Sequence, residues 1–487
     1  MGGGGVCRLI QINVERSAFR EYWTFCPIAD ARPVCESMVA PSLVRPGGPC
    51  AMSTLSPTRS THDHGTKADA DVAPGEIAVG VVIGRASEYF DFFVFGIASA
   101  LVFPAVFFPF MDRLEGTLWS FALFALAFVA RPFGTMLSMK IQARWGRGIK
   151  LTVALFLLGT ATAGIAFLPG YGTLGGTAIV LLALFRVLQG LAMGGSWDGL
   201  PSLLALNAPK DRRGWYAMLG QLGAPVGFIV AAGVFAFLYA SLEPADLLSW
   251  GWRYPFFVAF AINVVALFAR LRIVVAEEYQ HRMGELELEP TPVRELFRAK
   301  GRHVVIGAFA ALASYALFHI VTIFPLSWIL LYSQQSIVSF LIVQIVGAFI
   351  AAGAIVASGV IADRFGRART LGALAVGIAM FSGFAPTLME GGPVGQGAFI
   401  LVGFALLGLS YGQAAGAVTA NFGQRYRYTG AALTSDLAWL IGAAFAPLVA
   451  LGLCANFGLA WLGAYLLSGA LGTLVALGIN RAMNYKS

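Results

Sequence analysis

The chain has 487 residues, of which 58% are apolar and only 12% are charged, and its formal net charge is +8. The mean hydropathy is +0.74. A typical soluble protein has about 25% charged residues, so this composition excludes a soluble domain and a disordered chain. The lysines and arginines occur in short clusters between long apolar runs and not on one basic face, which excludes a nucleic-acid-binding protein. We therefore expect the chain to lie in a lipid bilayer.

The first 75 residues differ in composition from the rest. They contain a four-glycine run and scattered prolines without helical periodicity, so we expect residues 1–75 to form a disordered N-terminal extension. They lack the basic start and apolar run of a signal peptide. Our hypothesis is that translation starts at Met52, which makes residues 1–51 a misassigned start. The alternative is a redox or metal-binding tail, although no metal-ligand spacing relates its cysteines, Cys7, Cys26, Cys35 and Cys50.

Beyond residue 75 the sequence consists of apolar runs, each long enough to provide the roughly 20 helical residues that cross a hydrocarbon core. Small residues at four-residue spacing, as in Gly190 and Gly194, are typical of close helix contacts in lipid. The sequence therefore predicts an all-α integral membrane protein. Its twelve transmembrane helices are expected at residues 77–104, 114–139, 150–168, 176–206, 215–240, 253–273, 304–331, 336–362, 370–389, 397–421, 429–453 and 458–480.

The loops between these spans alternate in charge. One set carries basic clusters, whereas the opposite set carries Arg113 and otherwise mainly acids. The positive-inside rule places the basic set, and with it both termini, in the cytoplasm. A longer, densely charged stretch separates spans six and seven. We therefore predict an N-terminal six-helix bundle at residues 76–273, a cytoplasmic linker at 274–303 and a C-terminal six-helix bundle at 304–487.

A basic turn follows the second span of each half, and its two copies, which contain Arg144 and Arg364, are 220 residues apart. The second copy, Gly359-x-x-x-Asp363-Arg364-x-Gly366-Arg367, resembles the loop motif of the major facilitator superfamily. That resemblance implies the major facilitator fold, with two pseudo-symmetric six-helix bundles around a central cavity lined by spans one, four, seven and ten. The alternative, a loop that only sets topology, explains the arginines but not the glycines and the aspartate.

The resemblance also implies a gate, because an aspartate at a helix end can accept hydrogen bonds from arginine and helix amides in one conformation only. The first copy has lost its acid, since Ala143 stands where the second copy has Asp363. We expect that latch to be the weaker one. The predicted gating residues are Arg144, Gly146, Arg147, Gly359, Asp363, Arg364, Gly366 and Arg367.

Further motifs resemble the metabolite:proton symporter family within that superfamily. They are Glu88-Tyr89-Phe90-Asp91-Phe92-Phe93 in span one, Arg131-Pro132-x-Gly134 at the end of span two and Arg186-x-x-Gln189-Gly190 in span four. Two departures put the family's typical substrate in doubt. Span one gains Arg85, and Ser196 stands where the family usually has glutamate.

Three ionisable residues fall near the expected midplane of the bilayer. They are Glu88, Asp91 and Arg186, and an ionisable group in hydrocarbon needs a partner or a function. Carriers of this kind hold substrate and coupling ion at the midplane, so we predict that these residues couple proton and substrate movement. We favour Asp91 as the proton carrier and Glu88 as the static partner of Arg85. The alternative is a static ion pair that holds spans one and four together.

Weaker candidates for substrate binding are the other polar and aromatic residues of the spans. Arg131 is expected either to meet Asp198 as a latch or to extend to the interface. His319 suits proton transfer or simple packing, and Asp436 is either solvated or in contact with substrate. The complete predicted substrate-binding set is Tyr89, Arg131, Gln189, Trp197, Asp198, Gln221, Tyr315, His319, Tyr411, Gln413 and Asp436.

An intramembrane enzyme is the rival class. Gly408-Leu409-Ser410-Tyr411-Gly412 matches the nucleophile elbow of hydrolases, but that chemistry needs a later histidine, and every histidine precedes Ser410. We therefore expect no enzyme, no metal and no cofactor.

The expected function is proton-driven symport of a small organic metabolite across a plasma membrane, here a bacterial inner membrane. An arginine near the midplane favours a carboxylate. Alternatives are a zwitterionic osmolyte such as proline or betaine, a uniporter or exchanger, and a non-transporting sensor. The expected partners are the substrate, the proton and the lipid bilayer, without nucleic acid, and the chain is expected to be a monomer.

Overall fold

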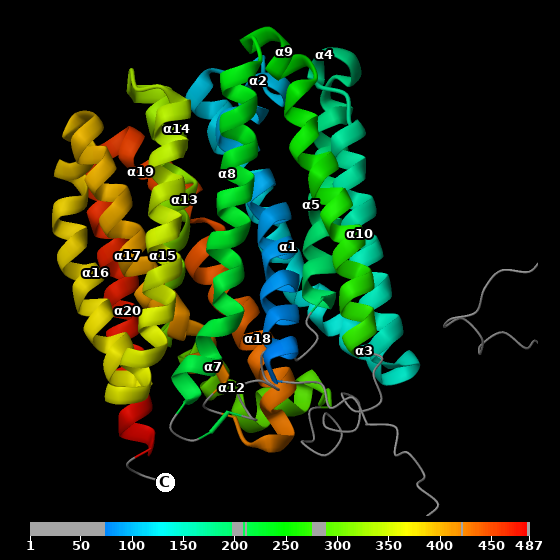
Figure 1. Cartoon of the computed structure of the whole chain (residues 1–487), viewed down its shortest axis with the longest axis vertical. Coiled ribbons are helices and arrows are strands. Elements are labelled where there is room, and N and C mark those ends of the chain that lie inside the picture. The colour runs from blue at the N-terminus through cyan, green and yellow to red at the C-terminus, as the bar shows by residue number, and fades with distance from the viewer. Residues whose placement is uncertain (1–73, 197–207, 210–211, 275–288, 420–421, 485–487) are drawn as a thin grey trace, which may run out of the picture. The chain divides into compact units, whose positions relative to one another are not determined.

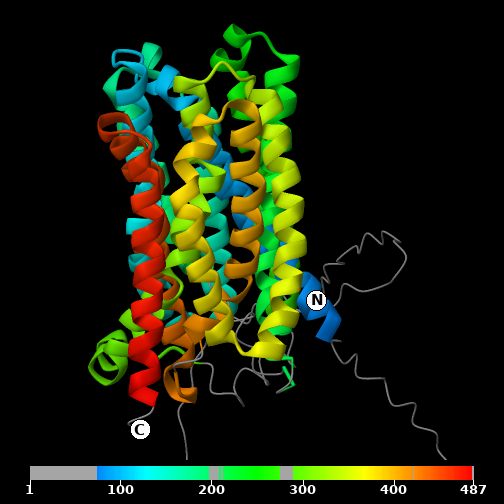
Figure 2. The same cartoon turned by 90° about the vertical axis from the view of Figure 1, so that its left-hand side faces the viewer.

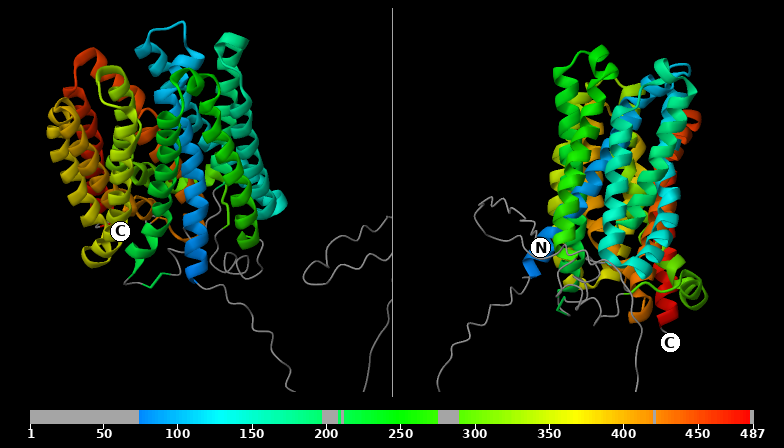
Figure 3. Two further views of the ribbon diagram at one scale, coloured as in Figure 1. Left: turned by 45° about the horizontal axis from the view of Figure 1, so that its top comes forward. Right: turned by 90° about the vertical axis from the view of Figure 1, so that its right-hand side faces the viewer.

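The computed structural model describes residues 74–196, 208–209, 212–274, 289–419 and 422–484. Within these ranges every regular element is a helix. The N-terminal half contains α1 to α10 and the C-terminal half contains α12 to α20 (Figure 1). Figures 2 and 3 show that the long helices of both halves run roughly parallel to one axis.

The N-terminal half begins with α1, whose bounds agree closely with the first expected span. Short helices in the connections, α2, α4 and α9, lie together at the top of Figure 1. The elements are α1 (Pro74–Leu101), α2 (Phe103–Phe107), α3 (Arg113–Phe167), α4 (Tyr171–Leu174), α5 (Gly176–Gly195), α7 (Arg213–Leu219), η1 (Gly220–Leu222), α8 (Gly223–Ser241), α9 (Pro244–Ser249), η2 (Gly251–Arg253) and α10 (Tyr254–Val274).

The C-terminal half begins inside the expected linker, because α12 starts eleven residues before the seventh predicted span. Its elements are α12 (Val293–Ala310), α13 (Leu312–Thr322), α14 (Phe324–Tyr332), α15 (Ile337–Phe365), α16 (Arg367–Glu390), α17 (Gly392–Thr419), η3 (Gln424–Tyr426), α18 (Arg427–Ala438), η4 (Trp439–Ala444), α19 (Ala446–Phe457) and α20 (Ala460–Asn484).

The two basic turns have the same backbone conformation. Gly146 has φ of +85° and divides α3 into the second and third expected spans, and Gly366 has φ of +86° between α15 and α16. A side chain at either position would be strained. In the described ranges, ten helical stretches are long and apolar enough to cross a membrane. With α3 counted as two helices and α1 added, the fold has the twelve expected spans.

Spans seven and eleven are interrupted where the two halves meet. Span seven consists of α12, α13 and α14, with breaks at Ala311 and Ile323. Span eleven consists of α18, the six-residue π-helical segment η4 and α19. Such irregular backbone is tolerated at membrane depth when it is buried in protein. The described parts of both segments are rich in buried residues.

Glycines allow α3 and α5 to approach within backbone contact. A Cβ added at Gly190 or Gly194 would collide with the backbone at Ala127 or Arg131, and one at Gly134 would collide with Leu191. Small residues are what permit this approach in lipid, where no hydrophobic force drives helices together. The expected glycine spacing therefore joins spans two and four.

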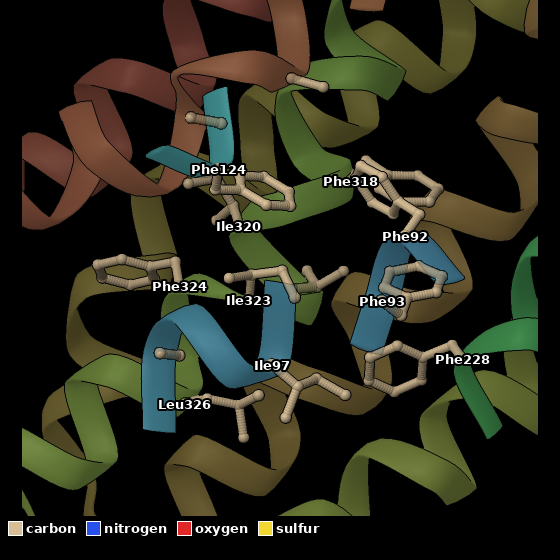
Figure 4. Close-up of a cluster of buried hydrophobic side chains, with 14 of the residues drawn as sticks. Phe92, Phe93, Ile97, Phe124, Phe228, Phe318, Ile320, Ile323, Phe324 and Leu326 are labelled. Atoms are coloured by element: carbon tan, nitrogen blue, oxygen red, sulfur yellow. The ribbon is translucent and has the colours of Figure 1, made fainter. Parts of the chain in front are cut away.

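The centre of the molecule is filled by aromatic side chains from both halves. Figure 4 shows Phe92 and Phe93 of α1 facing Phe318 of α13, with Phe228 of α8 close by. The rings of Phe93 and Phe318 are stacked with centroids 5.6 Å apart. Beside these rings, a small space of about 20 Å³ is lined by residues of both halves, including Phe93, Phe318 and Tyr411. A larger space of about 440 Å³ lies between α2, α9 and the end of α14.

Candidate functional site

A polar network lies inside the N-terminal half, between α1, α3 and α5. The carboxylate of Asp91 accepts hydrogen bonds from Thr162 Oγ1 at 2.7 Å and from Gln189 Nε2 at 3.3 Å. Gln189 Oε1 in turn accepts a hydrogen bond from Arg186 Nη1 at 3.0 Å. All four side chains are almost completely buried. Asp91 and Arg186 are thus connected through the amide of Gln189, not by the direct ion pair that the sequence analysis assumed.

The guanidinium of Arg186 is surrounded by aromatic rings. Its central carbon lies 4.0 Å from the ring centre of Phe95 and 5.0 Å from that of Phe124, whose carbonyl oxygen accepts from Nε. Nη2 has no hydrogen-bond partner and is inaccessible. Cation–π contacts stabilise such a buried charge in part. Arg186 therefore faces the protein interior and retains one unused donor group.

His319 of α13 approaches this network from the C-terminal half. Its ring centre lies 5.2 Å from those of Phe92 and Phe124 and 6.1 Å from that of Trp439. The side chain is fully buried, and neither ring nitrogen has a partner. Buried polar groups are normally hydrogen-bonded. The imidazole of His319 and Nη2 of Arg186 are therefore groups that could bind a polar ligand or exchange a proton.

Glu88 and its neighbours form a second cluster, one turn closer to the N-terminus of α1. Arg85 Nη1 donates to Glu88 at 2.6 Å, which is the pairing that the sequence analysis expected. Glu88 is therefore not a partner of Arg186. The hydroxyl of Tyr89 forms a hydrogen bond with the hydroxyl of Tyr411. That bond joins α1 to α17 across the two halves.

Tyr315 and Trp439 complete this cluster from the C-terminal half. The ring centre of Trp439 lies 5.0 Å from that of Tyr315, and both lie near Tyr411. Phe128 of α3 stacks on Trp439 at 5.8 Å. Rings from four elements thus form one surface in the middle of the molecule. Gln221 in η1 is also buried, and its Oε1 has no partner.

Arg131 and Asp436 form an ion pair between the halves, with Nε and Oδ1 separated by 2.8 Å. The sequence analysis paired Arg131 with Asp198 or with the interface, and it left Asp436 either solvated or in contact with substrate. Both residues are in fact buried and face each other. The proline-containing segment of α3 and the last turn of α18 bring them together. Trp197 and Asp198 lie outside the described residues.

The second basic turn is built into the contact between the halves. The carboxylate of Asp363 accepts hydrogen bonds from the backbone N–H groups of Gly214 at 2.5 Å and Trp215 at 3.1 Å, at the start of α7. Gly359 provides the space for this approach, because a Cβ there would lie 3.1 Å from Trp215 Cα. Arg364 lies over the ring of Phe365.

Arg367 extends the same contact. Its Nη1 donates to the carbonyl of Gly416 at 2.8 Å, and its Nη2 donates to the carbonyl of Arg213 at 3.3 Å. Gln413 belongs here too, since its Nε2 donates to the carbonyl of Gly214 at 3.2 Å. Gln413, which the sequence places among the substrate-binding candidates, is thus part of the contact between the halves in this structure.

Among the described residues, the first basic turn has no carboxylate that caps a helix of the other half as Asp363 does. Ala143 is exposed and has no side-chain acceptor to cap α18. Arg144 lies over the ring of Trp145, and Arg147 forms an ion pair with Glu289 at 3.0 Å. Buried polar contacts at this end are made instead by Lys150, whose Nζ donates to Tyr428 at 3.0 Å, while that hydroxyl donates to Gln142.

Sequence reasoning missed several members of these networks. Thr162, Thr135 and Tyr428 are polar residues within or beside apolar runs, where a serine or threonine commonly bonds its own helix backbone. No signal in one sequence shows that they face another helix. Among the described residues, no group of three or more histidine, cysteine, aspartate or glutamate side chains could hold a metal ion.

The two helical bundles, together with the polar contacts that join them, are typical of a membrane transport protein. The family model of the Major Facilitator Superfamily matches residues 170–447. The chain belongs to this superfamily, and it is a transporter rather than an enzyme.

Relatives support the same class. The chain is 34% identical over 439 residues to the inner membrane metabolite transport protein YhjE of Escherichia coli, which covers 88% of this chain and 99% of that protein. It is 31% identical to the shikimate transporter of Escherichia coli, over 81% of this chain and 91% of that protein. It is also 30% identical to a proline/betaine transporter of that organism, over 42% of this chain and 41% of the relative.

Solved structures show the same fold. A crystal structure of a D-xylose-proton symporter superposes with a TM-score of 0.62 at 20% identity, covering 82% of this chain and 96% of that one. A partially occluded inward-open form of the xylose transporter XylE from Escherichia coli superposes with a TM-score of 0.61 at 18% identity, with the same coverage. This chain is therefore a multi-pass membrane transporter of the Major Facilitator Superfamily, related to metabolite transport proteins.

Proposed function

We propose that the protein is a proton-coupled symporter of a small carboxylate, with Asp91 as the proton carrier and Arg186 as the substrate anchor. The observation that carries this proposal is the buried chain Asp91–Gln189–Arg186, in which Nη2 of Arg186 is unpaired. A guanidinium is the natural partner of a carboxylate because it can donate two parallel hydrogen bonds.

Coupling follows from competition for one positive charge. In the state described here, Arg186 helps to keep the nearby Asp91 ionised in a medium of low dielectric constant. A substrate carboxylate that binds Arg186 neutralises this support, and Asp91 then takes up a proton. When the substrate leaves on the other side, Arg186 attracts Asp91 again and the proton departs. Proton and substrate therefore move together.

Gln189 has a positioning role in this scheme. Its amide occupies the place of a direct ion pair, with Oε1 facing Arg186 and Nε2 facing Asp91 and Thr162. A direct bidentate pair would consume the donors that the substrate needs. The amide transmits the charge state of Asp91 to Arg186 while leaving Nη2 available.

A zwitterionic substrate is the second candidate, and the ring surface formed by Tyr89, Tyr315, Tyr411 and Trp439 favours it. Such faces attract quaternary ammonium groups through cation–π interaction. One relative is named as a shikimate transporter and another as a proline/betaine transporter. Shikimate is a carboxylate, and proline and betaine are zwitterions, so both chemistries contain the anion that Arg186 would bind.

The remaining parts of the proposal concern energy, setting and oligomeric state. The proton gradient supplies the energy, without a cofactor. The protein works as a monomer in a bacterial inner membrane with both termini in the cytoplasm. The basic turns and the relative named as an inner membrane protein support this orientation and location. Fusion of a periplasm-dependent reporter enzyme to the C-terminus tests it, and an active reporter contradicts the orientation.

The function is tested by uptake into proteoliposomes under an imposed pH gradient, with shikimate, 2-oxoglutarate, proline and glycine betaine as probes. We expect one carboxylate to accumulate with the gradient and not after a protonophore is added. Accumulation of only the zwitterions identifies the second candidate. Absence of gradient-driven accumulation for every probe that binds contradicts proton coupling.

Asp91→Asn tests the assignment of the proton carrier, because it mimics the protonated form. We expect it to abolish uphill accumulation and to retain exchange of substrate across the membrane. Asp112→Asn is the matched control. Asp112 is exposed and caps α3 through the N–H of Glu115, a role that asparagine also fills. If Asp91→Asn and Glu88→Gln both accumulate substrate with an unchanged pH profile, coupling does not lie in α1.

A further inference from the structure

A buried carboxylate in the C-terminal half is held entirely by the N-terminal half. One carboxylate oxygen of Asp436 in α18 forms an ion pair with Arg131 Nε at 2.8 Å, and the other accepts a hydrogen bond from Thr135 Oγ1 at 2.5 Å. The side chains of Arg131 and Asp436 are 9% and 3% exposed. Both partners come from α3, so separation of the two halves at this place must break every one of these contacts together.

The pair belongs to an antiparallel contact between α3 and span eleven. Phe128 stacks on Trp439 one turn away on the side of the central rings. In the opposite direction, Tyr428 contacts Gln142 and Lys150. These contacts lead from the centre to the end of the bundle that carries the basic turns, called the basic end below. Figure 1 shows α7, α12 and α18 gathered at that end.

The charged and titratable groups near Asp436 are few. On α3 they are Arg131 and Lys150. Lys150 contacts Tyr428, which lies two turns before Asp436 on α18. On α13 it is Tyr315, which lies within the field of Arg131. On α12, Glu295 faces Tyr426 and Arg425 at the start of α18. Among described residues, Arg131 is therefore the cation in direct contact with Asp436.

Opening of the basic end has an electrostatic cost at this pair. Removing one partner from a buried ion pair leaves an uncompensated charge, which is strongly unfavourable. Water that enters as the halves separate would solvate part of the carboxylate charge. Asp436 would still lose its contacts with the Arg131 cation and the Thr135 hydroxyl at the same time. A proton on Asp436 removes the charge and leaves Arg131 free to meet an anion moving through the opening.

We propose that Asp436 is a second proton-exchange residue, whose protonation releases the Arg131–Asp436 latch and opens the basic end. This inference rests on the proposed proton-coupled transport, but it concerns a different carboxylate from Asp91 and a different half of the molecule. Protonation of Asp436 gates passage from the centre to the basic end. Protonation of Asp91 accompanies substrate at the centre.

Opening is measured as the distance between spin labels on the two halves, in nanodiscs, at about pH 8 and about pH 5. A carboxyl group titrates in this range only when its surroundings favour the protonated form beyond the ordinary case. The labels occupy Ala143→Cys and Ala368→Cys, two exposed positions at the basic end, in a chain whose own cysteines are replaced by alanine. In the otherwise unchanged protein, we expect the long-distance population to increase at the lower pH.

Asp436→Asn removes the charge without changing the side-chain size. We expect the open-to-closed ratio to rise about tenfold or more at the higher pH, because a buried pair loses one partner, and we expect its pH dependence to disappear. Thr135→Val keeps the ion pair, so it should shift the ratio less and retain the pH dependence. If Asp436→Asn fails to fold, the shift of the open-to-closed ratio in Thr135→Val still tests the latch, because Thr135 donates to Asp436. A normal closed population with normal pH dependence in Asp436→Asn overturns the proposal, as does loss of the pH dependence in Thr135→Val.

Asp91→Asn separates this inference from the proposed function. We expect Asp91→Asn to lose coupled uptake while the distances still respond to pH. If the response disappears in Asp91→Asn and persists in Asp436→Asn, the gate proposal fails and the proposed function stands. If the response follows Asp436 but no gradient drives uptake in the unchanged protein, the proposed function fails and the latch assignment stands.

Discussion

The latch formed by Asp363 allows a quantitative prediction for Asp363→Asn. The carboxylate caps the first turn of α7 through the N–H groups of Gly214 and Trp215, at 2.5 Å and 3.1 Å. A carboxylate at a helix N-terminus contributes about 0.5–2 kcal/mol through its hydrogen bonds and its charge. Asparagine retains one acceptor oxygen and loses the charge. We therefore expect a loss of about 0.5–1 kcal/mol, which moves the closed-to-open ratio by roughly 2- to 5-fold.

Two measurements test this value. Hydrogen exchange at the amides of Gly214 and Trp215 should accelerate by a factor in that range, and turnover should fall more than substrate affinity, because the latch is remote from the central network. Asp112→Asn is again the control, since Asp112 caps α3 within one half and should change neither. Loss of binding with intact exchange kinetics would refute the gate assignment.

Three further predictions follow from packing. Gly190→Ala places a methyl group against the backbone of Ala127, and we expect about 1–3 kcal/mol of destabilisation, visible as a lower melting temperature in detergent. Tyr411→Phe removes the hydroxyl contact with Tyr89 and should weaken substrate affinity without unfolding the protein, so unchanged affinity contradicts a role in binding. His319→Phe removes two unpaired buried nitrogens. The free energy of unfolding should rise by about 1–3 kcal/mol, while uptake falls. Normal uptake would instead show that His319 is a packing residue.

The fold could be predicted from the sequence because each membrane span is visible as its own apolar run. Apolar runs of sufficient length identified the helices, and the similar basic turns around Gly146 and Gly366 indicated the internal repeat. Two of the breaks in spans seven and eleven did have a sequence signal, because Pro325 and Pro447 stand in the first turns of α14 and α19, just after Ile323 and Phe445. A proline inside an apolar run ends or kinks the helix that precedes it. The break at Ala311 has no such signal.

The site was predictable by residue type but not by partner. Burial cost identified Glu88, Asp91 and Arg186 as residues that need a counterpart, whereas Asp436 was left as either solvated or in contact with substrate. A helical face of about 60° grouped Glu88 with Asp91, yet their partners lie in different directions. Which polar group reaches which depends on helix rotation and on the close approach that glycine allows, and neither is encoded locally.

The glycine contact between α3 and α5 has a consequence for the transport cycle. Because Asp91, Thr162, Gln189 and Arg186 all lie in the half that these helices build, their mutual distances stay nearly constant when the halves rotate against each other. In the proposed symport mechanism, the free energy that couples proton to substrate is then the same on both sides of the membrane. Substitutions in α13, such as at His319, should therefore alter the relative occupancy of the two orientations without altering the number of protons moved per substrate.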